Sequence, residues 1–273
     1  WVDGITAQNP YSGAVPVSQE AVKDTQNGGT PVLLAVTVAK YADKEKKILA
    51  YDSARTLDMD SLVKGEGATD YTVSFTPEDD GEYVLYAWWQ HPSGEQKNLI
   101  PYYGEAFANC SALFVDSLEF STHLDWTWGL LEDFEVRYGY DITPYLAGVY
   151  QASSSGNYMG DPNPDFKFDT QETQLQNDFK DELTQLYIEN HLEPLSAFCE
   201  KHGIKLRYQT SYGKSLELAQ TAMHVDIPET ETLYGKDIVD FYRLQAGAVH
   251  MTDKNVYSIE ASPELLTKFG FWE

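Results

Sequence analysis

The first hundred residues alternate short apolar runs with turn-forming residues. Four runs have the length and the β-branched or aromatic content of strands: Val32–Val38, Ile48–Tyr51, Tyr71–Phe75 and Tyr83–Trp89. The turn-forming cluster Thr76–Gly81 separates the last two runs and predicts a hairpin between them. We therefore expect residues 1–100 to form an antiparallel, sandwich-like β-rich domain, either accessory to a second domain or inserted in it.

After residue 100 the apolar spacing becomes helical between short strands. The helical spacing predicts Leu130–Tyr138, Phe179–Gly203 with a bend at Pro194, Leu216–Met223 and Ile238–Met251. The strands predicted with them are Ala112–Val115, Ile204–Tyr208, His224–Ile227 and Val256–Ile259. Strands that alternate with helices form parallel sheets. We therefore predict an α/β fold in which residues 101–273 form part of a (β/α)8 TIM-type barrel.

The acidic composition excludes one class of partner. The chain has 43 Asp and Glu against 19 Lys and Arg, a formal charge of −24, and no run of basic residues. A nucleic acid backbone would be repelled by this charge. Acidity of this size is more often a solubility property of extracellular or halotolerant bacterial proteins than an indication of substrate. No apolar stretch reaches the roughly 18 residues of a membrane span, so none is predicted.

Motifs of several other enzyme classes are missing from the sequence. Cys110 and Cys199 are too few for a disulfide framework and lack the spacing of metal ligands. There is also no nucleophile elbow and no HExxH motif. The chain begins at Trp1 instead of Met, as expected of a processed or partial chain.

Polar side chains stand where each predicted parallel strand ends: Asp116, Glu119, Gln209, Glu229, Glu231 and Glu260. Barrel enzymes keep their chemistry at the carboxyl ends of strands. Hydrolysis of a glycosidic bond needs one carboxylic acid and one carboxylate, and this set supplies both. The alternative is that the acids cap the helices that follow. The two interpretations are equally strong for Asp116 and Glu229, and capping is the weaker one for the other glutamates.

Aromatic residues close to these acids suit a sugar site. They are Trp126, Trp128, Tyr208, Tyr212 and Tyr234. Such a ring alone is more often part of the core, but rings beside strand-end carboxylates favour stacking on a sugar. His123 follows Glu119 in the same loop and is a further candidate. The predicted substrate-binding residues are Asp116, His123, Trp126, Gln209, Tyr212 and Glu229.

The order of these residues resembles a known family. The matching segments and residues are Leu113–Glu119, Asp125–Thr127, Phe134–Asp141, Pro144–Leu146, Asp178–Phe179, Leu186–Tyr187, Gly203–Arg207, Gln209, Tyr212–Gly213, Asp226–Glu231, Ala246–His250 and Ser258–Glu260. They resemble the pattern of glycoside hydrolase family 106, the α-L-rhamnosidases. The resemblance extends from about residue 112 to residue 261 and is looser before residue 92.

The resemblance implies an inverting hydrolysis of terminal α-L-rhamnosyl linkages by two glutamates. By matched position Glu119 is the general acid, and Glu231 or Glu260 is the base that activates water. The resemblance also implies a calcium ion near the site, with unknown ligands, and an oligosaccharide or glycan substrate. It further implies a longer chain that supplies the remainder of the barrel, and an extracellular or periplasmic location in a bacterium.

Three alternatives stay open at this point. The same scaffold and carboxylates can serve a different sugar, because a fold does not select a substrate. The chain can instead be a catalytically silent carbohydrate-binding protein. It can also be an incomplete fragment of a larger glycosidase whose open sheet edge needs the missing strands.

Overall fold

A computed structural model describes seven stretches of the chain: residues 1–26, 29–90, 109–118, 124–150, 164–210, 216–235 and 238–260. The chain divides into two compact units. The first comprises Trp1–Gln96, Leu131–Ala152 and Asn163–Asn177, and the second comprises Lys97–Leu130, Ser153–Pro162 and Asp178–Glu273. No helix among the described stretches is long and apolar enough to cross a membrane.

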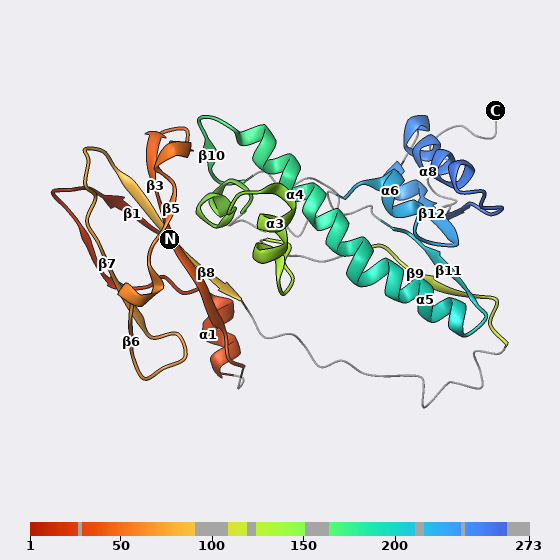
Figure 1. Cartoon of the computed structure of the whole chain (residues 1–273), viewed down its shortest axis with the longest axis horizontal. Coiled ribbons are helices and arrows are strands. Elements are labelled where there is room, and N and C mark those ends of the chain that lie inside the picture. Colours follow the sequence, from red (N-terminus) through yellow and green to blue (C-terminus); the bar gives the residue numbers. More distant parts are fainter. Residues whose placement is uncertain are drawn as a thin grey trace. The chain divides into compact units, whose positions relative to one another are not determined.

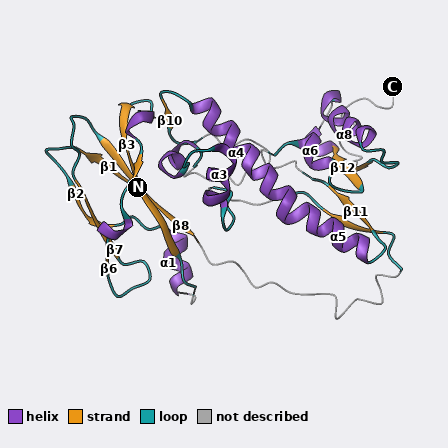
Figure 2. Ribbon diagram, viewed as in Figure 1, coloured by secondary structure: helices purple, strands orange, loops and turns teal. Residues whose placement is uncertain are grey.

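The larger sheet of the first unit has the strand order β1-β8-β3-β4-β10, with β5 paired to β3. Its strands are β1 (Val2–Ile5), β3 (Val32–Asp43), β4 (Ile48–Leu49), β5 (Arg55–Thr56), β8 (Tyr83–Gln90) and β10 (Lys167–Phe168). Figure 2 labels β1, β3, β8 and β10 among them. All of its pairs are antiparallel except β4 with β10. The predicted antiparallel β-rich region is therefore present.

A smaller antiparallel sheet has the order β2-β7-β6, formed by β2 (Tyr11–Ala14), β6 (Val63–Lys64) and β7 (Tyr71–Phe75). The predicted hairpin between β7 and β8 is wrong, because these strands belong to different sheets. Val73 and Phe75 of β7 share one apolar core with Leu85 of β8, so the residues after Phe75 cross between two sheets that face each other. Each strand gains more apolar burial in this way than it would as an exposed hairpin.

The helices of the first unit are short. They are α1 (Gln19–Gln26), α3 (Leu130–Tyr138) and the 3-10 turns η1 (Tyr51–Ser53), η2 (Met59–Ser61) and η3 (Thr143–Gly148). Helix α3 has the predicted bounds and ends at Gly139, whose φ of 79° is the left-handed conformation of a helix C-cap. Beyond Leu130 its residues group with the first unit, whereas we predicted a barrel helix. The domain boundary near residue 100 stays a prediction.

The second unit contains a parallel sheet of four strands in the order β13-β12-β11-β9. The strands are β9 (Ala112–Val115), β11 (Lys205–Tyr208), β12 (Ile227–Glu231) and β13 (Ser258–Glu260). The predicted parallel strands are confirmed. The third begins later than predicted, because the backbone N–H of His224 still bonds to the carbonyl of Thr221 in the preceding turn. The described strands do not close a barrel, so the TIM-type barrel stays a prediction.

Helices of this unit pack on the sheet. They are α4 (Glu172–Tyr187), which begins in the first unit, the π-helical turn η4 (Ile188–Leu192), α5 (Glu193–Lys201), α6 (Leu218–Ala222), α7 (Thr232–Gly235) and α8 (Val239–Met251). Figure 1 shows α5 beside β11, and the two elements are in contact. Pro194 lies in the first turn of α5, and the predicted split of the helix takes the form of the π-helical turn that directly precedes α5.

One face of the parallel sheet is apolar. Leu206 and Tyr208 of β11 are buried with Leu192 of η4 and Cys199 of α5. We predicted that the ring of Tyr208 lies beside the acids, and this is wrong, because the side chain is only 1% exposed within this core. Since strand side chains alternate, the residues on either side of Tyr208 point to the opposite face.

His191 borders this apolar layer with part of its side chain exposed, and we expect its imidazole to make the stability of the layer depend on pH. Burial lowers the pKa of His191 below its ordinary value of 6.5. Its ring stacks on Tyr187 with centroids 5.2 Å apart, and its Nε2 is 2.8 Å from the hydroxyl of Tyr208. Below about pH 6.5 His191 is therefore protonated to a greater extent in the unfolded chain than in the folded chain, and the free energy of unfolding falls.

We expect the melting temperature to fall between about pH 7 and pH 5, and His191→Gln to reduce this fall. Thermal unfolding followed by circular dichroism at both pH values measures the difference. His250→Gln, at an exposed position on α8, is the matched control. An equal loss of stability in wild type and His191→Gln would show that another group is responsible.

Candidate active site

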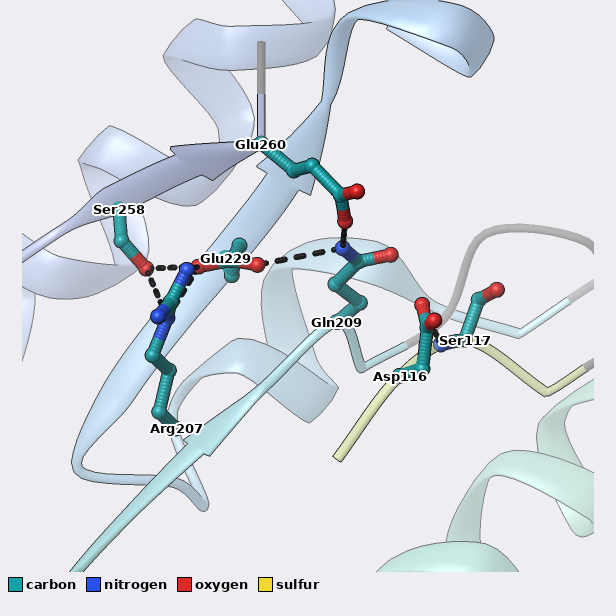
Figure 3. Close-up of polar contacts among 7 residues, drawn as sticks. All are labelled: Asp116, Ser117, Arg207, Gln209, Glu229, Ser258 and Glu260. Carbon is teal, nitrogen blue, oxygen red and sulfur yellow. Dashed lines mark hydrogen bonds and ion pairs between the residues drawn. The ribbon is translucent and has the colours of Figure 1, made fainter. Parts of the chain in front are cut away.

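The second face of the parallel sheet is polar. Arg207 precedes Tyr208 and Gln209 follows it, so both point away from the apolar core. The strand register places further residues on this face. Phe114 of β9 lies opposite Arg207, Ser258 lies opposite Glu229, and Glu260 lies opposite Glu231. Figure 3 shows Asp116, Arg207, Gln209, Glu229, Ser258 and Glu260 along this face, with Gln209 directly after β11 and Glu260 at the carboxyl end of β13.

Glu229 lies at the centre of this face with no exposed surface. Its Oε2 is contacted by both Nε and Nη2 of Arg207 and accepts a hydrogen bond from Ser258 Oγ at 2.5 Å. Its Oε1 accepts from Gln209 Nε2 at 3.2 Å. Burial of a carboxylate is costly unless the charge is paired and hydrogen-bonded, and here both oxygens have partners. The helix-cap alternative is therefore wrong for Glu229.

Arg207 is held on its other side by an aromatic ring. Its guanidinium carbon lies 4.8 Å from the centroid of the Phe114 ring on the neighbouring strand β9. Its Nε also lies 3.3 Å from Ser258 Oγ. A guanidinium that stacks on a ring and pairs with a carboxylate is restricted in orientation. Arg207 therefore fixes the position of the Glu229 carboxylate.

Gln209 joins two carboxylates. Its side-chain nitrogen Nε2 donates to Glu229 Oε1 at 3.2 Å and to Glu260 Oε2 at 2.6 Å. Gln209 is fully buried, and within the described stretches its carbonyl oxygen Oε1 has no hydrogen-bond partner. Glu260, the last residue of β13, is exposed. One amide thus connects a buried carboxylate to one that solvent can reach.

The polar cluster on this face, formed by Asp116, Arg207, Gln209, Glu229, Ser258 and Glu260, has more acidic than basic residues. Arg207 pairs with Glu229, and Asp116, Glu231 and Glu260 lie on the same face of the sheet. Such a surface repels anionic ligands and offers many hydrogen-bond acceptors to hydroxyl groups. The arrangement therefore suits a neutral polyhydroxylated ligand and can take up or release protons.

The structure brings together three of the predicted site residues, Gln209, Glu229 and Glu260. Asp116 follows β9, and its Oδ1 accepts from the backbone N–H of Ser117 at 2.8 Å. Trp126 is partly buried, and Glu231 is the partly buried last residue of β12. Glu119, His123 and Tyr212 lie outside the described residues, as does the side chain of Tyr234.

Two residues of the cluster were not predicted, Arg207 and Ser258. A sequence signal for them exists, because each precedes a predicted site residue by two positions in the same strand. Side chains separated by two positions in a strand lie on one face. A basic residue on the face that carries Glu229 was therefore a candidate partner for it.

The calcium ion implied by the resemblance stays a prediction. Among the described stretches, no three side chains of the types His, Cys, Asp and Glu come together as a metal site requires. Both carboxylates that contact Gln209 are already engaged with it. We therefore assign no chemical step to a metal ion.

Comparisons with known proteins identify the family. Residues 96–236, just over half of the 273, match the glycoside hydrolase 106 family model, described as alpha-L-rhamnosidase. No curated protein matches the sequence significantly. Among solved structures, the rhamnosidase from Novosphingobium sp. PP1Y is similar with 19% identity and a TM-score of 0.47, over 78% of this chain and 23% of that one. The chain thus spans about a quarter of that protein's length. The family match over more than half of the chain shows that this protein belongs to glycoside hydrolase family 106, the α-L-rhamnosidase family.

Proposed function

We propose that this chain carries part of the active site of a glycosidase that hydrolyses terminal α-L-rhamnosyl bonds with inversion. The observation that carries the proposal is the cluster of Gln209, Glu229 and Glu260 on one face of the parallel sheet, in which Gln209 and Glu260 lie at the carboxyl ends of their strands. Strand ends of this kind are where α/β enzymes bind and transform ligands. Membership of the family supports the choice of sugar.

Glu260 suits the role of base better than the other glutamates of the cluster. Glu229 is buried and its oxygens are engaged with Arg207, Ser258 and Gln209. Glu260 is exposed, so a water molecule can reach it, and its carboxylate is held by Gln209. Glu231 is partly buried beside it and is the alternative base.

Glu119, predicted by resemblance, is the general acid of the proposed reaction. The oxygen of a water molecule attacks the anomeric carbon while Glu260 accepts the water proton. The glycosidic C–O bond breaks, and Glu119 donates a proton to the leaving oxygen. The sugar configuration is inverted because water attacks from the face opposite the leaving group.

The remaining parts of the proposal concern binding and context. Asp116, His123, Trp126 and Tyr212 contact the sugar, Asp116 as a hydrogen-bond acceptor and the rings by stacking. The substrate is a glycan with a terminal rhamnosyl residue, and the rest of a longer chain completes the barrel. We place the protein in the periplasm or outside a bacterial cell, with calcium as a cofactor.

We expect this chain to release rhamnose from an aryl α-L-rhamnoside and to leave aryl glycosides of other sugars intact. A panel of aryl glycosides, assayed with calcium and with a chelator, measures substrate choice and metal dependence together. Release from another glycoside alone would contradict the proposed sugar. Equal rates in both buffers would contradict the calcium proposal.

A binding-only function is the second candidate, because the described strands of the parallel sheet form an open row of four. An incomplete barrel can bind a sugar without aligning acid and base. Isothermal titration calorimetry with L-rhamnose separates the two functions: heat of binding by a folded protein that releases no rhamnose favours binding alone.

A further inference from the structure

The negative charges of two carboxylates set the orientation of the Gln209 side-chain amide. Its Nε2 carries two hydrogens, one for the bond to Glu229 Oε1 and one for the bond to Glu260 Oε2. A flipped amide would place its carbonyl oxygen against both carboxylates, which is electrostatically unfavourable. The observed orientation therefore satisfies both donors and depends on the carboxylate of Glu229 keeping its place.

A continuous series of contacts keeps Glu229 in that place. The ring of Phe114 on β9 stacks on Arg207 of β11, and Arg207 pairs with Glu229 of β12. Ser258 of β13 donates to the same carboxylate oxygen as Arg207. All four residues stand on paired strands, which hold side chains more rigidly than loops do. Figure 3 shows the series from Arg207 to Glu260.

We propose that Gln209 is a positioning residue, which holds the carboxylate of Glu260 through its amide nitrogen while the Arg207–Glu229 pair orients that amide. The inference rests on the proposed function, in which Glu260 is the base. It gives Gln209 a task distinct from the direct substrate contact predicted from the sequence. It also makes Glu229 an anchor of the site that does not touch the sugar.

A double-mutant cycle tests this role in the full chain. Gln209→Met keeps the size of the side chain and removes both donors. We expect it to lower kcat on an aryl α-L-rhamnoside about 30-fold with little change in KM, because a misplaced base costs rate. In a Glu260→Ala background the same substitution should change the residual kcat less than about threefold, because the carboxylate that Gln209 positions is absent.

The cycle separates positioning from two other roles. A merely structural role, or a direct substrate contact, would lower the rate by the same factor in both backgrounds. Equal factors would therefore overturn the proposal. A rise in KM with unchanged kcat would overturn it as well, because that result indicates ground-state binding.

A second measurement needs neither activity nor a substitution in the core. Selective labelling of glutamine with nitrogen-15 reports the Nε2 protons of Gln209 in the substrate-free protein. We expect one proton to resonate far downfield in wild type, to move upfield in Glu260→Ala and to stay in place in the control Glu231→Ala. An unchanged resonance in Glu260→Ala would overturn the proposal.

This readout keeps the two proposals apart. If wild type releases no rhamnose, the proposed function fails for this chain, and the amide resonance still decides whether Gln209 holds Glu260. If rhamnose is released and the resonance does not respond, the positioning role alone fails.

Discussion

Glu260→Gln is expected to lower kcat for an aryl α-L-rhamnoside about 10³-fold, because a general base of this kind contributes 10²–10⁴-fold. The substitution keeps the shape of the side chain, and the amide oxygen can still accept the hydrogen bond from Gln209. Glu260 is exposed at the end of β13, so the folded structure should persist. Initial rates together with a circular dichroism spectrum measure both effects.

Glu231→Gln is the matched control, because Glu231 lies opposite Glu260 in the register of the two neighbouring strands. We expect this variant to keep more than about a tenth of the wild-type kcat if Glu260 is the base. Asp240→Asn, on the exposed surface of α8, controls for the change in net charge. If Glu231→Gln lowers kcat more than Glu260→Gln does, Glu231 is the base and Glu260 is not.

Arg207→Met is expected to lower the free energy of unfolding by about 3 kcal/mol, because it leaves a buried carboxylate without its cation. Glu229 has no exposed side-chain surface, and 40% of the Arg207 side chain is exposed. Urea unfolding followed by tryptophan fluorescence gives the free energy from the midpoint and slope.

Lys205→Met is the control on the same strand. Lys205 pairs with Asp226 at 3.6 Å, and both side chains are partly exposed, so its removal should cost less than about 1 kcal/mol. The double variant Arg207→Met/Glu229→Met should recover much of the lost stability, because it removes the unpaired charge as well. If Arg207→Met and Lys205→Met lose the same free energy of unfolding, the Arg207–Glu229 pair contributes no more to stability than an exposed pair does.

Much of the parallel sheet could be predicted from the sequence, because each of its strands is a short apolar run between helices with amphipathic spacing. The β-rich region was harder. The run Tyr71–Phe75 has the same local pattern whether it pairs with the next strand or faces it from a second sheet. Only the shared burial of Phe75 and Leu85 decides between these arrangements, and this depends on residues distant in sequence.

The candidate site was predicted in part. Gln209, Glu229 and Glu260 were identified from their positions at strand ends, and the structure joins them through one amide. Tyr208 was misplaced because adjacent residues of a strand face opposite sides. Arg207 was missed because a basic residue inside a strand has no motif, and its role depends on which strand pairs with its own.

The most direct test of the proposed function is proton NMR of an aryl α-L-rhamnoside incubated with this chain. The anomeric proton of the first sugar released reports its configuration before mutarotation mixes the anomers. We predict that β-L-rhamnose appears first, and that Glu260→Gln releases it about 10³-fold more slowly. Release of the α-anomer first, or no release by the folded wild-type chain, would contradict this prediction.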